Sequence, residues 1–184
     1  AGELGMQVPE SPILFLKPPT SVIGPGEAIV RPAMSSRVDY EAELGIVIRD
    51  RVSRIPPEAS RGHILGYTCA NDVTARDLQQ KDVQWTRAKS FDTFCPVGPW
   101  IQTDLDPDDL LVESYVNGER RQSSRTSQFI FGVDLLVSFI SQVMTLEPGD
   151  LIITGTPAGI GPMQAGDEVE VRIEGIGCLK NVVR

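Results

Sequence analysis

The chain has 184 residues, of which 41% are hydrophobic and 23% charged, and this is the composition of an ordinary globular protein with one core. Its formal net charge of −8 argues against a nucleic-acid or anionic-membrane surface. No apolar run approaches the roughly 20 residues of a membrane span, and no signal peptide is visible. Three cysteines without CxxC spacing indicate reduced thiols, so we expect a cytoplasmic protein.

The first half of the chain predicts short elements separated by turns. Residues 43–48 have the apolar pattern of a strand, and the charged triplet Arg49-Asp50-Arg51 ends it. Two prolines at 56–57 indicate the start of a helix that leads towards Ile64. The polar, unbranched residues from Thr74 to about Lys81 are typical of a second short helix.

The second half adds a hairpin, a longer helix and two strands. Residues 112–116 alternate like a strand and run into Asn117-Gly118, the strongest hairpin signal in the chain. Apolar residues at i, i+3, i+4 and i+7 predict a helix over Val133–Met144. Residues 151–154 and 168–173 follow as strands. We therefore predict one β-rich α+β domain over residues 1–184, without nucleic-acid or membrane partners.

Glu41 and Glu43 are two residues apart at the start of a predicted strand. In a strand, this spacing places both side chains on one face, about 6.5–7 Å apart. Two such charges repel each other unless they face water or share a cation. From spacing alone a solvated strand face is the commoner interpretation, and it is the one we adopt for Glu168 and Glu170.

Asp72 supplies a third carboxylate, at the corner where an apolar strand meets a helix. Without further context, capping of the helix N-terminus is the slightly better interpretation of Asp72. If the three carboxylates act together, their oxygens predict a hard cation, Mg²⁺, Mn²⁺ or Ca²⁺, rather than zinc.

Four blocks of sequence carry a resemblance that covers almost the whole chain. They are Asp-Tyr-Glu-Ala-Glu-Leu-Gly (39–45), Gly-Tyr-Thr-Cys-Ala-Asn-Asp-Val-Thr-Ala-Arg-Asp (66–77), Lys-Ser-Phe-Asp-Thr-Phe-Cys-Pro (89–96) and Leu-Glu-Pro-Gly-Asp-Leu-Ile-Ile-Thr-Gly-Thr-Pro-Ala-Gly-Ile-Gly-Pro (146–162). In this order, and followed by Glu-Gly-Ile-Gly at 174–177, they resemble the fumarylacetoacetate hydrolase family.

The resemblance implies a fold, a metal site and a substrate site. The fold would be a mixed β-sandwich roll, of the type of the family's C-terminal domain, with a few short helices, as a homodimer. A Mg²⁺ or Mn²⁺ ion (Ca²⁺ is the third option) would be held by Glu41, Glu43 and Asp72. Residues matching the family's substrate contacts are Arg76, Gln79, Lys89 and Thr156. Taken alone, Lys89 is an ordinary surface lysine and Thr156 a turn residue.

The family's hydrolytic members also activate water with a His–Glu pair ahead of a Pro-x-x-Phe-x-Lys segment. Here Glu3 lies at the matching distance before Pro12 to Lys17. The histidine would fall one position before Ala1, so we expect this sequence to lack an N-terminal segment that carries it. The single histidine, His63, follows a different pattern and is interpreted as a packing or surface residue.

These observations favour a metal-dependent hydrolase that cleaves a C–C bond in an acylpyruvate-like keto acid, with Glu3 and Lys89 as catalytic residues. One alternative keeps the metal and Lys89 but decarboxylates oxaloacetate. Another isomerises or decarboxylates 2-hydroxyhepta-2,4-diene-1,7-dioate or a related hydroxymuconate of aromatic catabolism. A third hypothesis, from a different class, is a metal-binding domain without catalysis.

Overall fold

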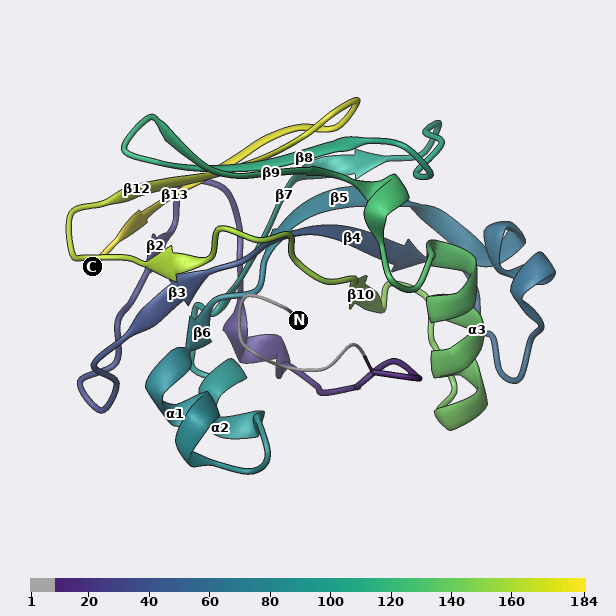
Figure 1. The fold of residues 1–184 in the computed structure, drawn as a ribbon. Coiled ribbons are helices and arrows are strands. Elements are labelled where there is room, and N and C mark those ends of the chain that lie inside the picture. Colours follow the sequence, from purple (N-terminus) through teal and green to yellow (C-terminus); the bar gives the residue numbers. More distant parts are fainter. Residues whose placement is uncertain (1–8) are drawn as a thin grey trace.

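The computed structural model describes residues 9–184, which form three β-sheets and a few short helices (Figure 1). The first sheet has five strands, in the order β1 (Val22–Ile23), β7 (Cys95–Gln102), β5 (Ile64–Asn71), β4 (Ala42–Ile48) and β10 (Leu151–Ile153). The second has three, β11 (Gly161–Pro162), β3 (Val38–Tyr40) and β6 (Thr74–Ala75). The third has five, β2 (Ala28–Ile29), β13 (Gly177–Val183), β12 (Glu168–Ile173), β8 (Leu111–Val116) and β9 (Glu119–Arg125).

Helices are short and lie at the margins of these sheets. The α-helices are α1 (Arg76–Lys81), α2 (Thr86–Lys89) and α3 (Val133–Val143), and the 3-10 helices are η2 (Pro19–Ser21), η3 (Pro57–His63) and η4 (Thr126–Gln128). The predicted β-rich α+β class is confirmed. Within residues 9–184, none of the helices has the length and apolar character that crossing a membrane requires.

The third sheet packs over the first, and their facing side chains form the main core (Figure 1). Leu44 and Ile46 of β4 are fully buried there, together with Val171 of β12 and Leu179 of β13. A second apolar cluster lies beside it, under the three-stranded sheet, and includes the fully buried Phe94. In β8 and β13, where buried and more exposed residues alternate, this alternation fixes which side of the strand faces the core, whereas β4 is buried on both sides.

Most predicted elements appear where their patterns placed them. The predicted 43–48 strand is β4, the hairpin joins β8 to β9, and the 133–144 helix is α3. Asn117 and Gly118 both have positive φ, of 52° and 80°, as a two-residue hairpin turn requires. The helix expected after Pro56 is the 3-10 helix η3, and the helix expected from Thr74 starts two residues later, after β6.

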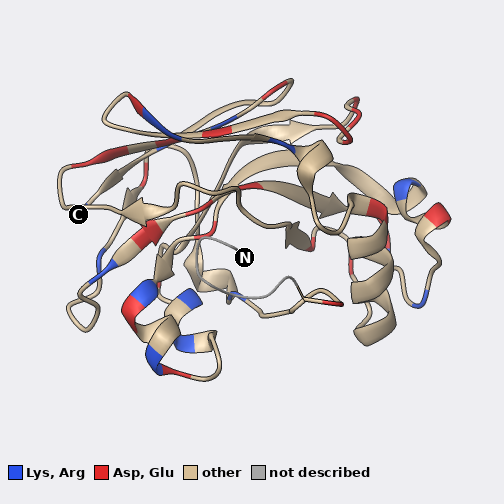
Figure 2. Ribbon diagram, viewed as in Figure 1, with Lys and Arg blue, Asp and Glu red and all other residues tan. Residues whose placement is uncertain are grey.

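The interpretation of Glu170 as a solvated strand residue is wrong. Its side chain is only 8% exposed, because Arg172 and Lys180 lie across it and donate to its carboxylate at 2.5 and 3.1 Å. Burial opposes ionisation of Glu170, but these hydrogen bonds outweigh it and lower its pKa. Elsewhere, positive and negative residues are interspersed, as on α1 and α2 (Figure 2).

The chain enters the fold through residues 9–17, here called the strap, which contain no helix or strand. The strap runs below the first sheet towards η2 (Figure 1, purple). Strand β1 then pairs in parallel with β7, with Val22 opposite Cys95, and this pairing fixes the end of the strap against the sheet.

Candidate metal centre

Two adjacent strands pass from one sheet to another at the same place. Glu41 is the single residue between β3, in the three-stranded second sheet, and β4, in the first sheet. Asp72 lies in the two-residue gap between β5 and β6, which belong to the same two sheets. The Asp72 amide donates to the Glu41 carbonyl at 2.9 Å, so the two residues lie side by side at this crossing.

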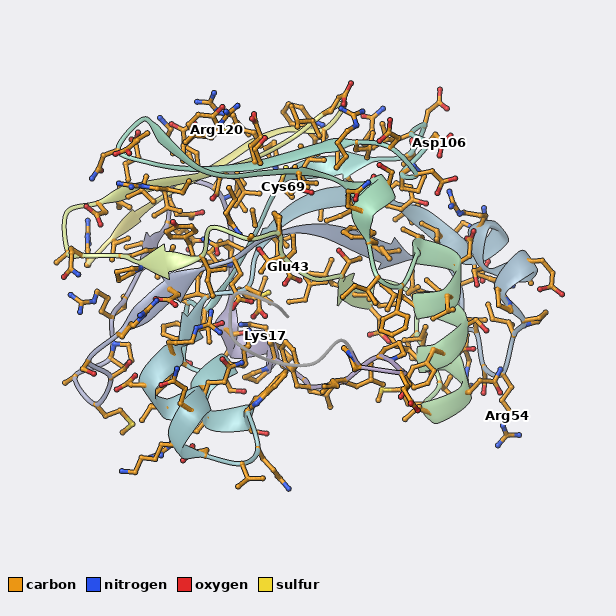
Figure 3. All side chains as sticks on the ribbon, viewed as in Figure 1. Lys17, Glu43, Arg54, Cys69, Asp106 and Arg120 are labelled. Atoms are coloured by element: carbon orange, nitrogen blue, oxygen red, sulfur yellow. The ribbon has the colours of Figure 1, made fainter. Side chains whose placement is uncertain are left out.

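The carboxylates of Glu41, Glu43 and Asp72 form one buried cluster. One oxygen of each lies within 4.8 Å of the others, and the residues are 6%, 4% and 1% exposed. Figure 3 shows Glu43 in the central region of the molecule, above Lys17 of the strap. Burial, followed by repulsion from Asp72 and Glu41, raises the pKa of Glu43 well above its usual value.

The ammonium group of Lys89 lies among these carboxylates. It donates to Glu41 Oε2 at 3.1 Å, to Asp72 Oδ2 at 2.5 Å and to Thr74 Oγ1 at 2.7 Å. Burial disfavours a charged lysine, but attraction to Asp72 and Glu41 outweighs it and raises the pKa of Lys89. Lys89 is therefore a protonated cation inside the cluster.

Further donors bind the opposite oxygens. Arg76 donates to Glu41 Oε1, the Gly155 amide donates to Glu43 Oε2 at 3.0 Å, and Lys17 donates to Asp72 Oδ1 at 2.5 Å. Burial alone would raise the pKa of Asp72, but the two lysines outweigh it and lower that pKa. The second oxygens of Glu41 and Asp72 face the space that the three carboxylates share, where they accept from Lys89, and carboxylate oxygens grouped in this way suit a hard divalent cation.

Helix α1 carries Arg76 and Gln79 and is anchored by Asp77. The Asp77 carboxylate accepts hydrogen bonds from Ser35 Oγ at 2.6 Å and from the Ser36 amide at 2.9 Å. Burial would raise the pKa of Asp77, but these bonds outweigh it and lower the pKa to about 2. The guanidinium of Arg76 is held by its own partners, and besides Glu41 it donates to Asp39 Oδ2 at 2.9 Å and to Gln79 Oε1 at 2.5 Å.

The cluster opens into a cavity of about 580 Å³. Its charged lining consists of Glu41, Glu43, Asp72, Lys89, Arg76 and Arg125, and most of the remaining wall is apolar. The apolar wall includes Pro12, Ile13, Phe15, Trp85, Phe129, Phe131, Leu136, Ile140 and Ile152. Phe15 of the strap packs edge-on against Trp85, with ring centroids 5.7 Å apart, and its ring lies 4.9 Å from Lys89 Nζ.

Three other predicted site residues, Arg76, Gln79 and Thr156, also line this cavity. Arg76 and Gln79 contribute to the wall, although Arg76 is already bound to carboxylates. The Thr156 hydroxyl donates to the Ala42 carbonyl at 2.9 Å and accepts from Gln122 at 2.8 Å, so its only hydrogen is already engaged. Glu3 lies outside the described residues.

Sequence reasoning assigned no role to Lys17, Phe15 or the Gly155 amide. Lys17 and Phe15 belong to the Pro-x-x-Phe-x-Lys segment, which served only to align Glu3, and that segment was the signal that could have identified them. A backbone amide leaves no signal in a side-chain pattern. Of these three, Lys17 is the most informative, because its side chain is only 6% exposed and contacts Asp72 directly.

The histidine and the cysteines lie apart from the cluster's ligand set. His63 Nδ1 is 2.5 Å from Asp50 Oδ1, in a pair that is partly exposed. The three cysteines are free thiols, as expected. Burial raises the pKa of Cys69 to about 12 and that of Cys95 to about 11, whereas Cys178 is exposed.

Comparison with known proteins gives one family. The family model described as fumarylacetoacetate (FAA) hydrolase C-terminal matches residues 1–184. A solved structure named 5-carboxymethyl-2-hydroxymuconate delta-isomerase, from Mycobacterium smegmatis, is 53% identical with a TM-score of 0.94. The match covers 95% of this chain and 70% of that one.

Two further relatives carry different activity names. The oxaloacetate tautomerase FAHD2B of Bos taurus is 42% identical over 193 residues, covering 98% of this chain and 62% of the relative. A structure of fumarylpyruvate hydrolase from Pseudomonas aeruginosa, in complex with Mn²⁺ and pyruvate, is 33% identical with a TM-score of 0.90. That match covers 95% of this chain and 79% of the other.

Proposed function

The chain belongs to the fumarylacetoacetate hydrolase family, and from this premise we propose that it is a divalent-metal-dependent enzyme acting on small 2-oxo acids. The observation that carries the proposal is the placement of three buried carboxylates and a buried ammonium group at one part of a single cavity. Polar groups converging in an otherwise apolar cavity are the usual form of a small-molecule site.

Glu41, Glu43 and Asp72 fit Mg²⁺ or Mn²⁺, because all three ligands are carboxylate oxygens. Support comes from the Mn²⁺ and pyruvate named with the Pseudomonas aeruginosa hydrolase. When bound, the cation supplies Lewis-acid polarisation of the substrate's 2-oxo group.

Lys89 stabilises the negative charge that develops on the substrate. Its pKa is raised, so the group is fully protonated at neutral pH. The cavity wall beside it is apolar, and Phe15 shields it from water on one side. A fixed positive charge in such a setting stabilises an enolate far better than it could in water. Gln79, whose Oε1 is held by Arg76, orients the substrate carboxylate through its amide NH₂, and Thr156 lines the same wall.

The reaction we propose is hydrolysis of an acylpyruvate-like β-diketo acid. Water adds to the distal carbonyl, the bond between that carbon and the adjacent CH₂ breaks, and its electron pair forms the enolate of pyruvate. The enolate carbon then takes up a proton, which gives pyruvate and a carboxylic acid. The apolar wall suits the acyl group, and Glu3 is our candidate general base for the water.

A second candidate uses the same enolate without hydrolysis. Isomerisation or tautomerisation of a 2-oxo dicarboxylate, or decarboxylation of oxaloacetate, needs the cation and Lys89 but no activated water. The names of the relatives at 53% and 42% identity favour this group of reactions.

A substrate panel distinguishes these reactions. The protein is incubated with Mn²⁺ and, separately, acetylpyruvate, oxaloacetate and a 2-hydroxydienedioate, and products are followed by NMR. Hydrolysis predicts acetate and pyruvate in equal amounts, with loss of turnover in EDTA. Turnover of the other two compounds alone would replace the hydrolase with the second candidate. Turnover of none, with metal bound, would reject both. Homodimeric assembly and a cytoplasmic location stay predictions, and light scattering tests the first.

A further inference from the structure

Each carboxylate of the cluster is held at one oxygen by its own donor. Arg76 takes Oε1 of Glu41, the Gly155 amide takes Oε2 of Glu43, and Lys17 takes Oδ1 of Asp72. The donors come from α1, from the loop after β10 and from the strap, so three separate segments perform the same task.

The opposite oxygens of Glu41 and Asp72 bind the ammonium group of Lys89. Lys89 Nζ contacts Oε2 of Glu41 at 3.1 Å and Oδ2 of Asp72 at 2.5 Å, which are not the oxygens that Arg76 and Lys17 bind. In Glu41 and Asp72, the two oxygens therefore have different partners. The outer oxygen is bound by Arg76 or Lys17, and the inner oxygen is bound by Lys89.

A carboxylate whose outer oxygen is already bound offers a metal only one ligand atom. Mg²⁺ and Mn²⁺ accept six ligands in a compact octahedron, whereas Ca²⁺ takes six to eight oxygens and readily uses both oxygens of one carboxylate. Building on the proposed function, we propose that these donors make the site select Mg²⁺ or Mn²⁺ over Ca²⁺, with Lys17 setting this selectivity at Asp72.

Lys17 is the donor whose role can be isolated. Its ammonium also donates to the Val73 carbonyl at 3.2 Å, and its side chain is 6% exposed. A charge buried to this extent must be compensated by such partners. Arg76 additionally binds Asp39 and Gln79, so its removal disturbs more than one carboxylate, and the Gly155 donor is backbone.

The test is calorimetric titration of the full chain with Mg²⁺, Mn²⁺ and Ca²⁺, in wild type and in Lys17→Met. Wild type should bind Mg²⁺ and Mn²⁺ more tightly than Ca²⁺. The variant frees Asp72 to bind through both oxygens, so we expect the Ca²⁺-to-Mg²⁺ affinity ratio to rise about tenfold, which is the lower end of the effect that losing a partner of a metal ligand has on metal affinity. Loss of a positive charge tightens binding of every divalent ion, and the ratio cancels that effect.

Two variants serve as controls. Lys89→Met removes a charge from the inner oxygen of the same carboxylate, so it should tighten all three ions with the ratio unchanged. Lys17→Arg keeps the donor and the charge and should keep the wild-type ratio. An equal change in affinity for all three ions in Lys17→Met would overturn the inference. Wild type that binds Ca²⁺ as tightly as Mg²⁺ would also overturn it, and this measurement can be made even if Lys17→Met fails to fold. Absence of binding of any ion to wild type would reject the proposed metal site itself.

Discussion

Replacing Glu43 by glutamine should make the metal-free protein more stable while removing its response to metal. Glu43 faces two negative partners, Glu41 and Asp72, and one positive partner, Lys89, so one repulsion is not cancelled. Two unit charges separated by 4.8 Å, the largest distance between the ligand oxygens of the cluster, repel by about 3.5 kcal/mol at an effective dielectric constant of about 20. The amide keeps the shape of the side chain and an oxygen that can accept from the Gly155 amide.

We therefore expect the free energy of unfolding of metal-free Glu43→Gln to rise by about 3 kcal/mol. For a chain of this size that corresponds to an increase in Tm of roughly 6 to 12 °C. Thermal unfolding followed by circular dichroism in EDTA measures it. With Mn²⁺ at about 100 times its Kd, wild type should gain about 2.7 kcal/mol, whereas the variant, lacking a ligand charge, should gain far less.

Glu168→Gln is the matched control, because Glu168 is partly exposed on β12 and pairs with Lys180 at 2.8 Å. It should change stability by less than about 1 kcal/mol and leave the metal response intact. The reasoning fails if metal-free Glu43→Gln is less stable than wild type. It also fails if this variant gains as much stability from Mn²⁺ as wild type does.

Three further predictions concern other parts of the fold. Asp77→Asn should be less stable than wild type above about pH 4, and the difference should close as the pH falls towards 2, because the wild-type carboxyl is then protonated as well. Denaturation at a series of pH values measures this. Thiol titration with a chromogenic disulfide should label Cys178 alone in the native protein and all three cysteines in guanidinium. Gly66→Ala should cost about 3 kcal/mol, since its Cβ would lie 2.5 Å from a backbone oxygen of β7, whereas Gly62→Ala, with open space around it, should cost almost nothing.

Each of these has an outcome that contradicts it. A constant stability difference for Asp77→Asn between pH 7 and 2 would show that its charge contributes nothing. Rapid native labelling of a second thiol would mean that a buried cysteine is accessible. Equal Tm values for the two glycine variants would show that β5 and β7 can separate without cost.

The sequence predicted the elements and the carboxylates well because both follow from local patterns. An apolar run identified β4, alternation identified β12, an i, i+3, i+4 period identified α3, and ordered family blocks brought Glu41, Glu43 and Asp72 together. In each case the informative residues lie close together in the chain or in recognisable motifs.

What the sequence could not give were contacts between distant segments. Lys17 and Asp72 are 55 positions apart, and no spacing rule relates them. The burial of Glu170 likewise depends on the side chain of Lys180, on the neighbouring strand, and on the position of the Arg172 side chain. The existing partners of Thr156 and Arg76 also became visible only in three dimensions, and they determine which hydrogen-bonding groups a substrate can use.

The crossing of two strands between sheets has a consequence for folding kinetics. The cluster exists only after the segments around residues 17, 41, 72 and 89 have come together, so most of its contacts span large separations in sequence. Contacts of this kind form late, after long loops have closed. A cation bound at the crossing would then stabilise the native state more than the transition state, and would slow unfolding without accelerating folding. The metal would stabilise the native state once it has formed and would take no part in the folding nucleus.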